Sequence, residues 1–229
     1  MKNSGFIADC VEWDIVNWSK ALTFWERKFN LQDKGFECLE LGSRSGGLSL
    51  WMAEKGNNVI CSDLENPEAQ ARKLHQRYSM RGRIEYEALD ATNIPYENRF
   101  DLIMFKSILG GVSRDGKSHL NKVVIDQIYK ALKVGGKLLF AENLEASKFH
   151  RFLRRKLVRW GSSWNYLKIA DVSELFEKFT DVDYEATGFL GSFGINESQR
   201  KILGRLDTVL FDRIVTDDMK YILFGVATK

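Results

Sequence analysis

The sequence lacks the features that mark several classes of protein. Its 3 cysteines, at positions 10, 38 and 61, form no CxxC pair, which argues against a disulfide framework and against a cysteine zinc site. The 2 prolines exclude long proline-rich linkers. The longest apolar runs are four residues, as at 102–105, whereas a membrane span needs about 20. The N-terminus has no apolar signal-peptide core, so a reducing cytoplasm is the expected location.

What is present describes an ordinary globular chain with one unusual segment. Of 229 residues, 44% are hydrophobic and 28% are charged, and this length suits one domain of the larger kind. The net charge is +3, but residues 146–167 contain no acidic side chain and residues 147–168 contain seven basic ones. The remainder therefore has 27 basic and 31 acidic residues, so a mildly acidic body carries one basic segment.

The middle of the chain alternates between strand-like and helix-like runs. Short apolar runs predict strands at 35–42, 58–63, 83–89, 100–105 and 137–142, with helices at 46–54, 67–80 and 118–132 between them. Strands separated by helices predict right-handed crossovers and a parallel sheet that is covered on both faces.

Both ends of the chain depart from this alternation. The first 30 residues predict a helical N-terminal cap, in which Trp13 and Trp25 pack onto the sheet and Trp18 either packs or closes over a ligand. After residue 145, helices are expected at 148–160, 171–179 and 197–215. A closing strand is expected at 221–228. No strand–helix–strand crossover like those in the middle of the chain precedes it, which favours an antiparallel last strand.

A glycine-containing turn follows the first strand and opens the next helix. Residues 39–47 read LELGSRSGG, and glycines let a backbone turn sharply while a helix N-terminus presents free N–H groups to a ligand. Asp63 ends the second strand about 20 residues later, where such an acid faces the ribose of an adenosine-containing ligand. A dinucleotide GxGxxG motif would need glycine at 42, 44 and 47, and position 44 is arginine, which disfavours a dehydrogenase.

These residues resemble the E/DxGxGxG first motif of class I S-adenosylmethionine-dependent methyltransferases. The matching positions are Glu40, Gly42 and Gly46, with Arg44 in place of the middle glycine. The resemblance continues through Asp90-Ala91 after the third strand, FDLIMFK at 100–106 and LKVGGKL at 132–138, in which valine replaces the usual proline. It covers about residues 35–142.

The resemblance implies a fold, a cofactor and a set of contacts. The fold is a Rossmann-like class I methyltransferase fold, α/β, with a mostly parallel seven-stranded sheet, helices on both faces and an antiparallel last strand. The cofactor is S-adenosylmethionine and its product is S-adenosylhomocysteine. The implied cofactor-binding residues are Glu40 near the methionine amino group, Asp63 on the ribose, Asp90 and Ala91 on the adenine, and Gly42, Ser43, Arg44, Gly46, Leu64 and Lys106 around them.

The catalytic residues are less defined than the cofactor site. A methyl group on a sulfonium is electrophilic, so alignment of the nucleophile supplies much of the rate, and a base is needed only if the nucleophile holds its proton. Weak candidates for that base are His119, His150 and Glu142; each is alternatively a surface histidine or a carboxylate that caps a turn. His75 is expected on the surface. No spacing of histidines and acids resembles a metal site, so none is predicted.

The acceptor is predicted only as a class. Residues 105–108 read FKSI where amino-methylating DNA enzymes have an Asn/Asp-Pro-Pro-Tyr/Phe motif, which disfavours base methylation. We expect O- or N-methylation of a small molecule or glycan, since residues 106–111 and 159–164 loosely resemble methyltransferases of bacterial surface-polysaccharide pathways. The alternatives are an RNA methyltransferase and a non-catalytic binding module that retains the fold.

The basic segment at 148–160 has three interpretations. It is a solvated helix face, an amphipathic helix on an anionic membrane surface, or a track for RNA phosphates. We expect a single domain made of a cap (1–34), a cofactor-binding core (35–145), a basic substrate-side segment (146–170) and C-terminal helices with closing strands (171–229). The location is the cytoplasm, either free or peripheral to the inner face of a membrane.

Overall fold

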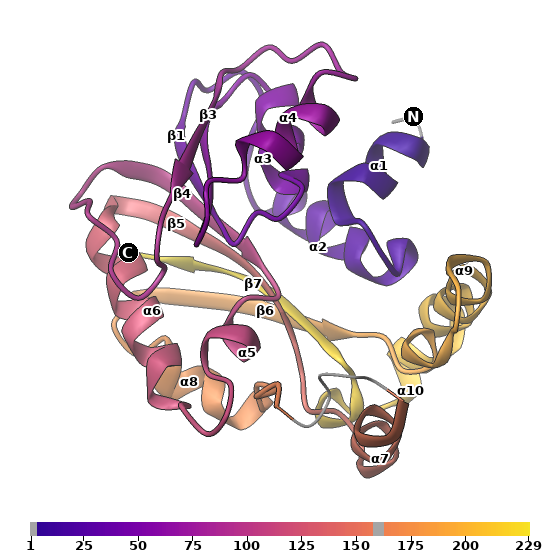
Figure 1. Cartoon of the computed structure of the whole chain (residues 1–229). Helices are drawn as coiled ribbons and strands as arrows, with labels where there is room; N and C mark the ends of the chain where they lie inside the picture. The colour runs from indigo at the N-terminus through magenta and orange to yellow at the C-terminus, as the bar shows by residue number, and fades with distance from the viewer. Residues whose placement is uncertain (1–3, 158–162) are drawn as a thin grey trace.

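A seven-stranded sheet forms the centre of the molecule (Figure 1). The computed structural model describes the backbone of residues 4–157 and 163–229, and the side chains of 4–152 and 163–229. The strand order is β3-β2-β1-β4-β5-β7-β6. The strands are β1 (Glu37–Leu41), β2 (Asn58–Asp63), β3 (Ile84–Ala88), β4 (Phe100–Lys106), β5 (Leu132–Asn143), β6 (Asp181–Thr187) and β7 (Ile222–Thr228).

The directions of the strands match the sequence prediction. β1 to β5 pair in parallel, and β7 pairs antiparallel with both β5 and β6. Four consecutive residues of β1, Cys38–Leu41, are all buried, as expected for a strand covered on both faces. The mostly parallel sheet with an antiparallel last strand is therefore confirmed.

Helices cover both faces of the sheet (Figure 1). One face carries α1 (Ser4–Val11), α2 (Ile15–Lys28), α3 (Gly47–Glu54) and α4 (Glu68–His75), and the other carries α5 (Leu109–Val112), α6 (His119–Ala131) and α8 (Val172–Leu175). Each face has its own apolar cluster. Trp18 and Trp25 lie almost fully buried in the first of these, so α2 packs tightly on the sheet.

A second group of helices gathers at one edge of the sheet (Figure 1). It contains α7 (Lys148–Leu157), η2 (Gly191–Phe193), α9 (Glu197–Leu206), the π-helical turn η3 (Asp207–Phe211) and α10 (Asp212–Ile214). Asn143 at the end of β5 and Thr187 at the end of β6 both pair with Ile222 at the start of β7. The group therefore lies at the edge where the parallel strands end.

The C-terminal part differs from the sequence prediction in detail. The expected helix at 197–215 is interrupted by the π-helical turn, and the expected helix at 171–179 is reduced to η1 (Ile169–Asp171) and α8. The 310 turn η4 (Asp217–Met219) precedes β7. Residues 158–160 of the expected helix at 148–160 lie outside the described residues. None of the helices in the described part of the chain has the length and hydropathy that a membrane span requires.

Candidate active site

The turn between β1 and α3 has a backbone that favours glycine. Gly42 and Gly46 have φ values of 63° and 75°, in the left-handed region that residues with a Cβ rarely adopt. A Cβ on Gly42 would lie 2.4 Å from Cγ2 of Ile108, and one on Gly46 would lie 2.6 Å from Nε2 of His75. Arg44 also has a positive φ, 50°, which is a backbone conformation that favours glycine.

Glu40 fastens this turn to the start of α3. Its carboxylate is buried and accepts hydrogen bonds from the backbone N–H of Leu48 (3.2 Å) and of Ser49 (2.8 Å), and from the Ser49 hydroxyl. Burial raises the pKa of Glu40 to about 7, against the lowering effect of these hydrogen bonds. The acid at the end of an apolar strand thus has its partners in the amides of the helix N-terminus.

Asp63 holds the other side of the turn. One carboxylate oxygen accepts from the backbone N–H of Arg44 (2.9 Å) and the other from that of Leu64 (2.8 Å). A carboxylate offers about four acceptor sites, so both oxygens of this half-buried group can accept further hydrogen bonds. The Leu64 side chain beside it is 70% exposed and presents an apolar surface to a ligand.

Asp90 and Ala91 follow β3 along the same edge. Asp90 is exposed, and one of its carboxylate oxygens accepts from the backbone N–H (2.8 Å) and the hydroxyl (2.7 Å) of Thr92. Ala91 is partly buried against the second apolar cluster. The turn is therefore fixed by its own hydrogen bonds, and the carboxylate stays accessible.

Lys106 ends β4 beneath the N-terminal segment. Its Nζ lies 3.1 Å from the ring centroid of Trp13 and 4.7 Å from that of Trp18. Burial lowers the pKa of Lys106 to about 7, although Glu12 favours the charged form. Nζ has no hydrogen-bond partner among the described residues, and neither has the buried hydroxyl of Ser43.

The segment between α1 and α2 covers the glycine turn. The Arg44 guanidinium lies 5.1 Å from the Trp13 ring centroid, and its Nη1 is 3.6 Å from a carboxylate oxygen of Glu12. Sequence reasoning assigned Trp13 to packing alone, because no local pattern indicates that its ring contacts both Arg44 and Lys106. A hollow of about 810 Å³, lined by both signs of charge, opens beside this segment toward α4.

The three candidate bases occupy different environments. The Glu142 carboxylate is buried, with its pKa raised to about 7 by burial, and accepts from the backbone N–H groups of Leu109 and Asn143, both at 2.8 Å. His119 is exposed at the start of α6. His150 is 1% exposed and uses both ring nitrogens, on the Ser147 hydroxyl and on the carbonyl of Phe189. Only Glu142 lies near Lys106, whose charged form it favours.

His75 was expected on the surface, and that expectation is wrong. It is 2% exposed, its Nδ1 lies 2.8 Å from the Tyr86 hydroxyl and its Nε2 lies 2.8 Å from the carbonyl oxygen of Gly46. It supports the glycine turn from beneath. No group of three or more histidine, cysteine or acidic side chains in the described chain could hold a metal ion.

A family model described as a methyltransferase domain matches residues 39–140. This range runs from β1 to β5 and contains the glycine turn, Asp63, Asp90 and Lys106. No curated protein matches the chain by sequence. The cofactor of class I methyltransferase domains is S-adenosylmethionine.

Solved structures of methyltransferases have the same fold. Phosphoethanolamine N-methyltransferase 2 of Haemonchus contortus, in complex with S-adenosyl-L-methionine, is 20% identical with a TM-score of 0.61 over 96% of this chain and 56% of that one. A methyltransferase described as putative from Bacillus halodurans is 16% identical, with a TM-score of 0.61 over 92% of this chain and 99% of that one. The 1,6-didemethyltoxoflavin-N1-methyltransferase of Burkholderia thailandensis, in complex with S-adenosylhomocysteine, is 16% identical. Its TM-score is 0.57 over 91% of this chain and 76% of that one. The chain spans about half the length of the Haemonchus enzyme.

Proposed function

We propose, from the methyltransferase domain at residues 39–140, that the chain transfers a methyl group from S-adenosylmethionine to an oxygen or nitrogen of a small-molecule or glycan acceptor. The observation that carries this proposal is the edge formed by the ends of β1, β2, β3 and β4. There, a left-handed glycine turn and two accessible carboxylates lie on neighbouring strands with a lysine whose buried amine has no hydrogen-bond partner in the described part of the chain.

The residues at this edge suit the cofactor chemically. Asp63 has acceptor sites left for ribose hydroxyls, and Asp90 is accessible to an adenine amino group. Leu64 offers exposed apolar surface next to Asp63, and the Ser43 hydroxyl, which has no hydrogen-bond partner among the residues described, suits the polar methionine end. Bound S-adenosylmethionine supplies an electrophilic methyl group.

Lys106 is proposed as the residue that handles the proton or the charge of the acceptor. Trp13 and Trp18 exclude water from its amine, and the pKa of about 7 makes the neutral form accessible at physiological pH. A neutral amine accepts the proton of a nucleophile, whereas the charged form binds an anionic acceptor group. Glu142 and His119 have no such role in this proposal, and His150 is a buried structural histidine.

The acceptor class rests on resemblance and on the site. The Haemonchus and Burkholderia enzymes are named for N-methylation of small molecules, which supports a small acceptor. We propose that the acceptor lies between Lys106 and the described part of the segment that follows β5, residues 146–157 and 163–170. We also propose a reducing cytoplasmic location, because no disulfide joins the buried cysteines of the described chain.

Calorimetric titration with S-adenosylmethionine and S-adenosylhomocysteine tests the cofactor site. Asp63→Ala should weaken binding at least about tenfold, because it removes a hydrogen-bond acceptor of the ribose and an anchor of the turn. Glu65→Ala is the matched control, since it removes an exposed carboxylate two residues away. A folded protein that binds neither ligand would favour the non-catalytic binding module instead.

An acceptor screen then tests the reaction itself. It begins with nucleotide-sugars and lipid-linked glycans and ends with RNA. Methylation of RNA, with an affinity that falls steeply with salt, would replace the small-molecule proposal.

A further inference from the structure

The outward side of α9, η3 and α10 is apolar. Ile202 is 62% exposed, Leu206 45%, Val209 70%, Leu210 48% and Ile214 64%. We call these five residues the outer face. An amphipathic helix of a globular protein ordinarily turns such residues toward the core, so an exposed apolar stripe indicates a surface that binds something.

Within α9, η3 and α10 the exposed charges have one sign, whereas Asp217 and Asp218 are exposed in η4 beyond them. The exposed charged side chains of α9, η3 and α10 are Lys201, Arg205 and Arg213. The acidic side chains of the same elements are used inward. The carboxylate of Glu197 accepts from the backbone N–H groups of Asp14 (2.9 Å) and Ile15 (2.8 Å) at the start of α2. The outer face is therefore both apolar and basic.

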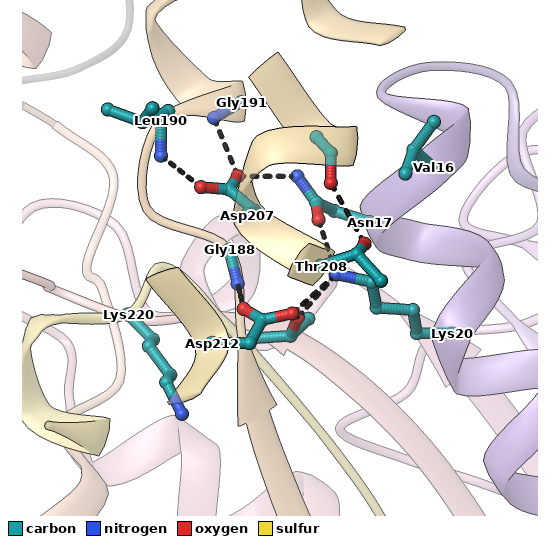
Figure 2. Close-up of polar contacts among 12 residues, drawn as sticks. Val16, Asn17, Lys20, Gly188, Leu190, Gly191, Asp207, Thr208, Asp212 and Lys220 are labelled. Atoms are coloured by element: carbon teal, nitrogen blue, oxygen red, sulfur yellow. Dashed lines mark hydrogen bonds and ion pairs between the residues drawn. The ribbon is translucent and has the colours of Figure 1, made fainter. Parts of the chain in front are cut away.

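Two aspartates hold these helices in that orientation (Figure 2). Asp207 accepts from the backbone N–H groups of Leu190 (2.7 Å) and Gly191 (2.8 Å) and from Nδ2 of Asn17 (3.0 Å). Asp212 accepts from Lys20 Nζ (2.7 Å) and the backbone N–H of Gly188 (2.9 Å). The polar side is fixed to α2 and to the end of β6, which leaves the apolar side outward.

The π-helical turn explains how both aspartates point the same way. Asp207 and Asp212 are five residues apart, and a π-helical turn brings residues at that spacing one above the other. In an α-helix of 3.6 residues per turn they would point in clearly different directions. Gly204, one turn earlier, lets α9 approach α2, since a Cβ there would lie 2.9 Å from Cβ of Val16. The orientation is thus built into the packing.

Helix α7 adds exposed aromatic residues at the same edge of the sheet. Phe149 and Phe152 are 57% and 53% exposed. The Phe149 ring lies 5.4 Å from that of Phe193 in η2, and η2 packs against α9. The sequence of α7 continues through Arg154-Arg155-Lys156, within the segment that has no acidic residue.

We propose that the outer face, together with Phe149 and Phe152, binds the surface of an anionic phospholipid bilayer. Apolar side chains on helices that lie in the plane of a membrane enter the boundary between headgroups and acyl chains, and basic side chains bind anionic lipids. A second copy of the chain fits less well, because a two-fold contact through this face would bring Lys201, Arg205 and Arg213 against the same cations. This inference goes beyond methyl transfer and does not depend on it.

The test is sedimentation of the full chain with vesicles. Vesicles of phosphatidylcholine alone are compared with vesicles that also contain phosphatidylglycerol. Binding to the anionic vesicles is expected, and the double variant Leu206→Glu with Val209→Glu should weaken it at least about tenfold. Val134→Glu is the matched control, because Val134 is 87% exposed near the start of β5, outside these helices, and it should leave binding unchanged. Lys201→Glu with Arg205→Glu should also weaken binding to anionic vesicles.

Several results would overturn the proposal. The first is equal binding to neutral and anionic vesicles, and the second is unchanged binding by the Leu206 and Val209 double variant. The third is loss of binding only in Arg154→Glu with Arg155→Glu, which would assign the lipid contact to the basic segment. A dimer in sedimentation velocity that the double variant dissociates would assign the face to a second copy. S-adenosylhomocysteine titration of each variant reports separately on whether the fold and the proposed cofactor site are intact.

Discussion

At the scale of single residues, Lys106 is the feature with the clearest energetic consequence. Its pKa of about 7 lies below the ordinary value of 10.5, so the folded chain binds fewer protons than the unfolded chain between these pH values. Stability is therefore lost as the pH falls from about 10 toward 7, and it changes no further from this source at lower pH. Burial of this amine costs stability at neutral pH.

Lys106→Met should consequently stabilise the fold while it impairs function. At pH 7 the gain should be on the order of 2 kcal/mol, reduced by the lost contact with Trp13, and it should shrink toward pH 10. Urea unfolding at the two pH values measures this gain, with exposed Lys117→Met as the control. Methyl transfer should fall at least about tenfold. A variant that loses stability and keeps its activity would make Lys106 purely structural.

Arg44 gives a second residue-scale prediction. Its φ of 50° strains any side chain with a Cβ, so Arg44→Ala should be less stable than Arg44→Gly by about 1 kcal/mol. Both variants lose the contact with Trp13, so the difference between their free energies of unfolding measures the backbone strain alone. Chemical denaturation of the pair measures it. Equal stability would show that the turn relaxes to another conformation.

Sequence reasoning at this scale identified residue types better than their surroundings. Glu40 and Asp63 were chosen from their places at strand ends, and both do anchor the glycine turn. His75 was wrongly expected on the surface because its partners, Tyr86 and the Gly46 carbonyl, cannot be recognised from its neighbours along the chain. A buried histidine and a surface histidine look alike when only their neighbours along the chain are known.

At the scale of elements, Asp207 holds α9 and α10 against α2. Asp207→Ala would leave the backbone N–H groups of Leu190 and Gly191 without their acceptor and would remove one acceptor of Asn17 Nδ2, which should cost about 2–4 kcal/mol. Hydrogen exchange should show lost protection over residues 197–214, more than in the rest of the chain. Exposed Asp218→Ala should change neither stability nor protection. Uniform loss of protection would mean that these helices unfold only with the whole domain.

The hydrophobic periodicity of the sequence does not predict two of the elements. β6 reads DVDYEAT and is an edge strand with only its last residue fully buried, so it has no apolar run to reveal it. The π-helical turn inserts one residue into an otherwise regular helical pattern, and its cause lies in the contacts of Asp207 and Asp212 with α2 and β6. Local patterns predict the inner strands of the parallel core well because β1, β2 and β4 are buried along most of their length.

At the scale of the whole molecule, ligand binding should be linked to global stability. A ligand at one hundred times its dissociation constant stabilises the folded state by about 2.7 kcal/mol. S-adenosylhomocysteine at that excess should therefore raise the melting temperature of the chain by several degrees, and it should raise that of Asp63→Ala by at most about half as much at the same concentration. A shift that is equal in both proteins would place the ligand elsewhere.

The position of β7 has a consequence for how the molecule is made. β7 follows every other strand along the chain, yet it lies between β5 and β6. While the ribosome is still synthesising the chain, β5 therefore presents an unpaired edge and β6 has no neighbour in the sheet. The sheet can be completed only after β7, the last strand to be synthesised, has left the ribosome. Until then the strand edges of β5 and β6 are exposed, and exposed strand edges favour aggregation.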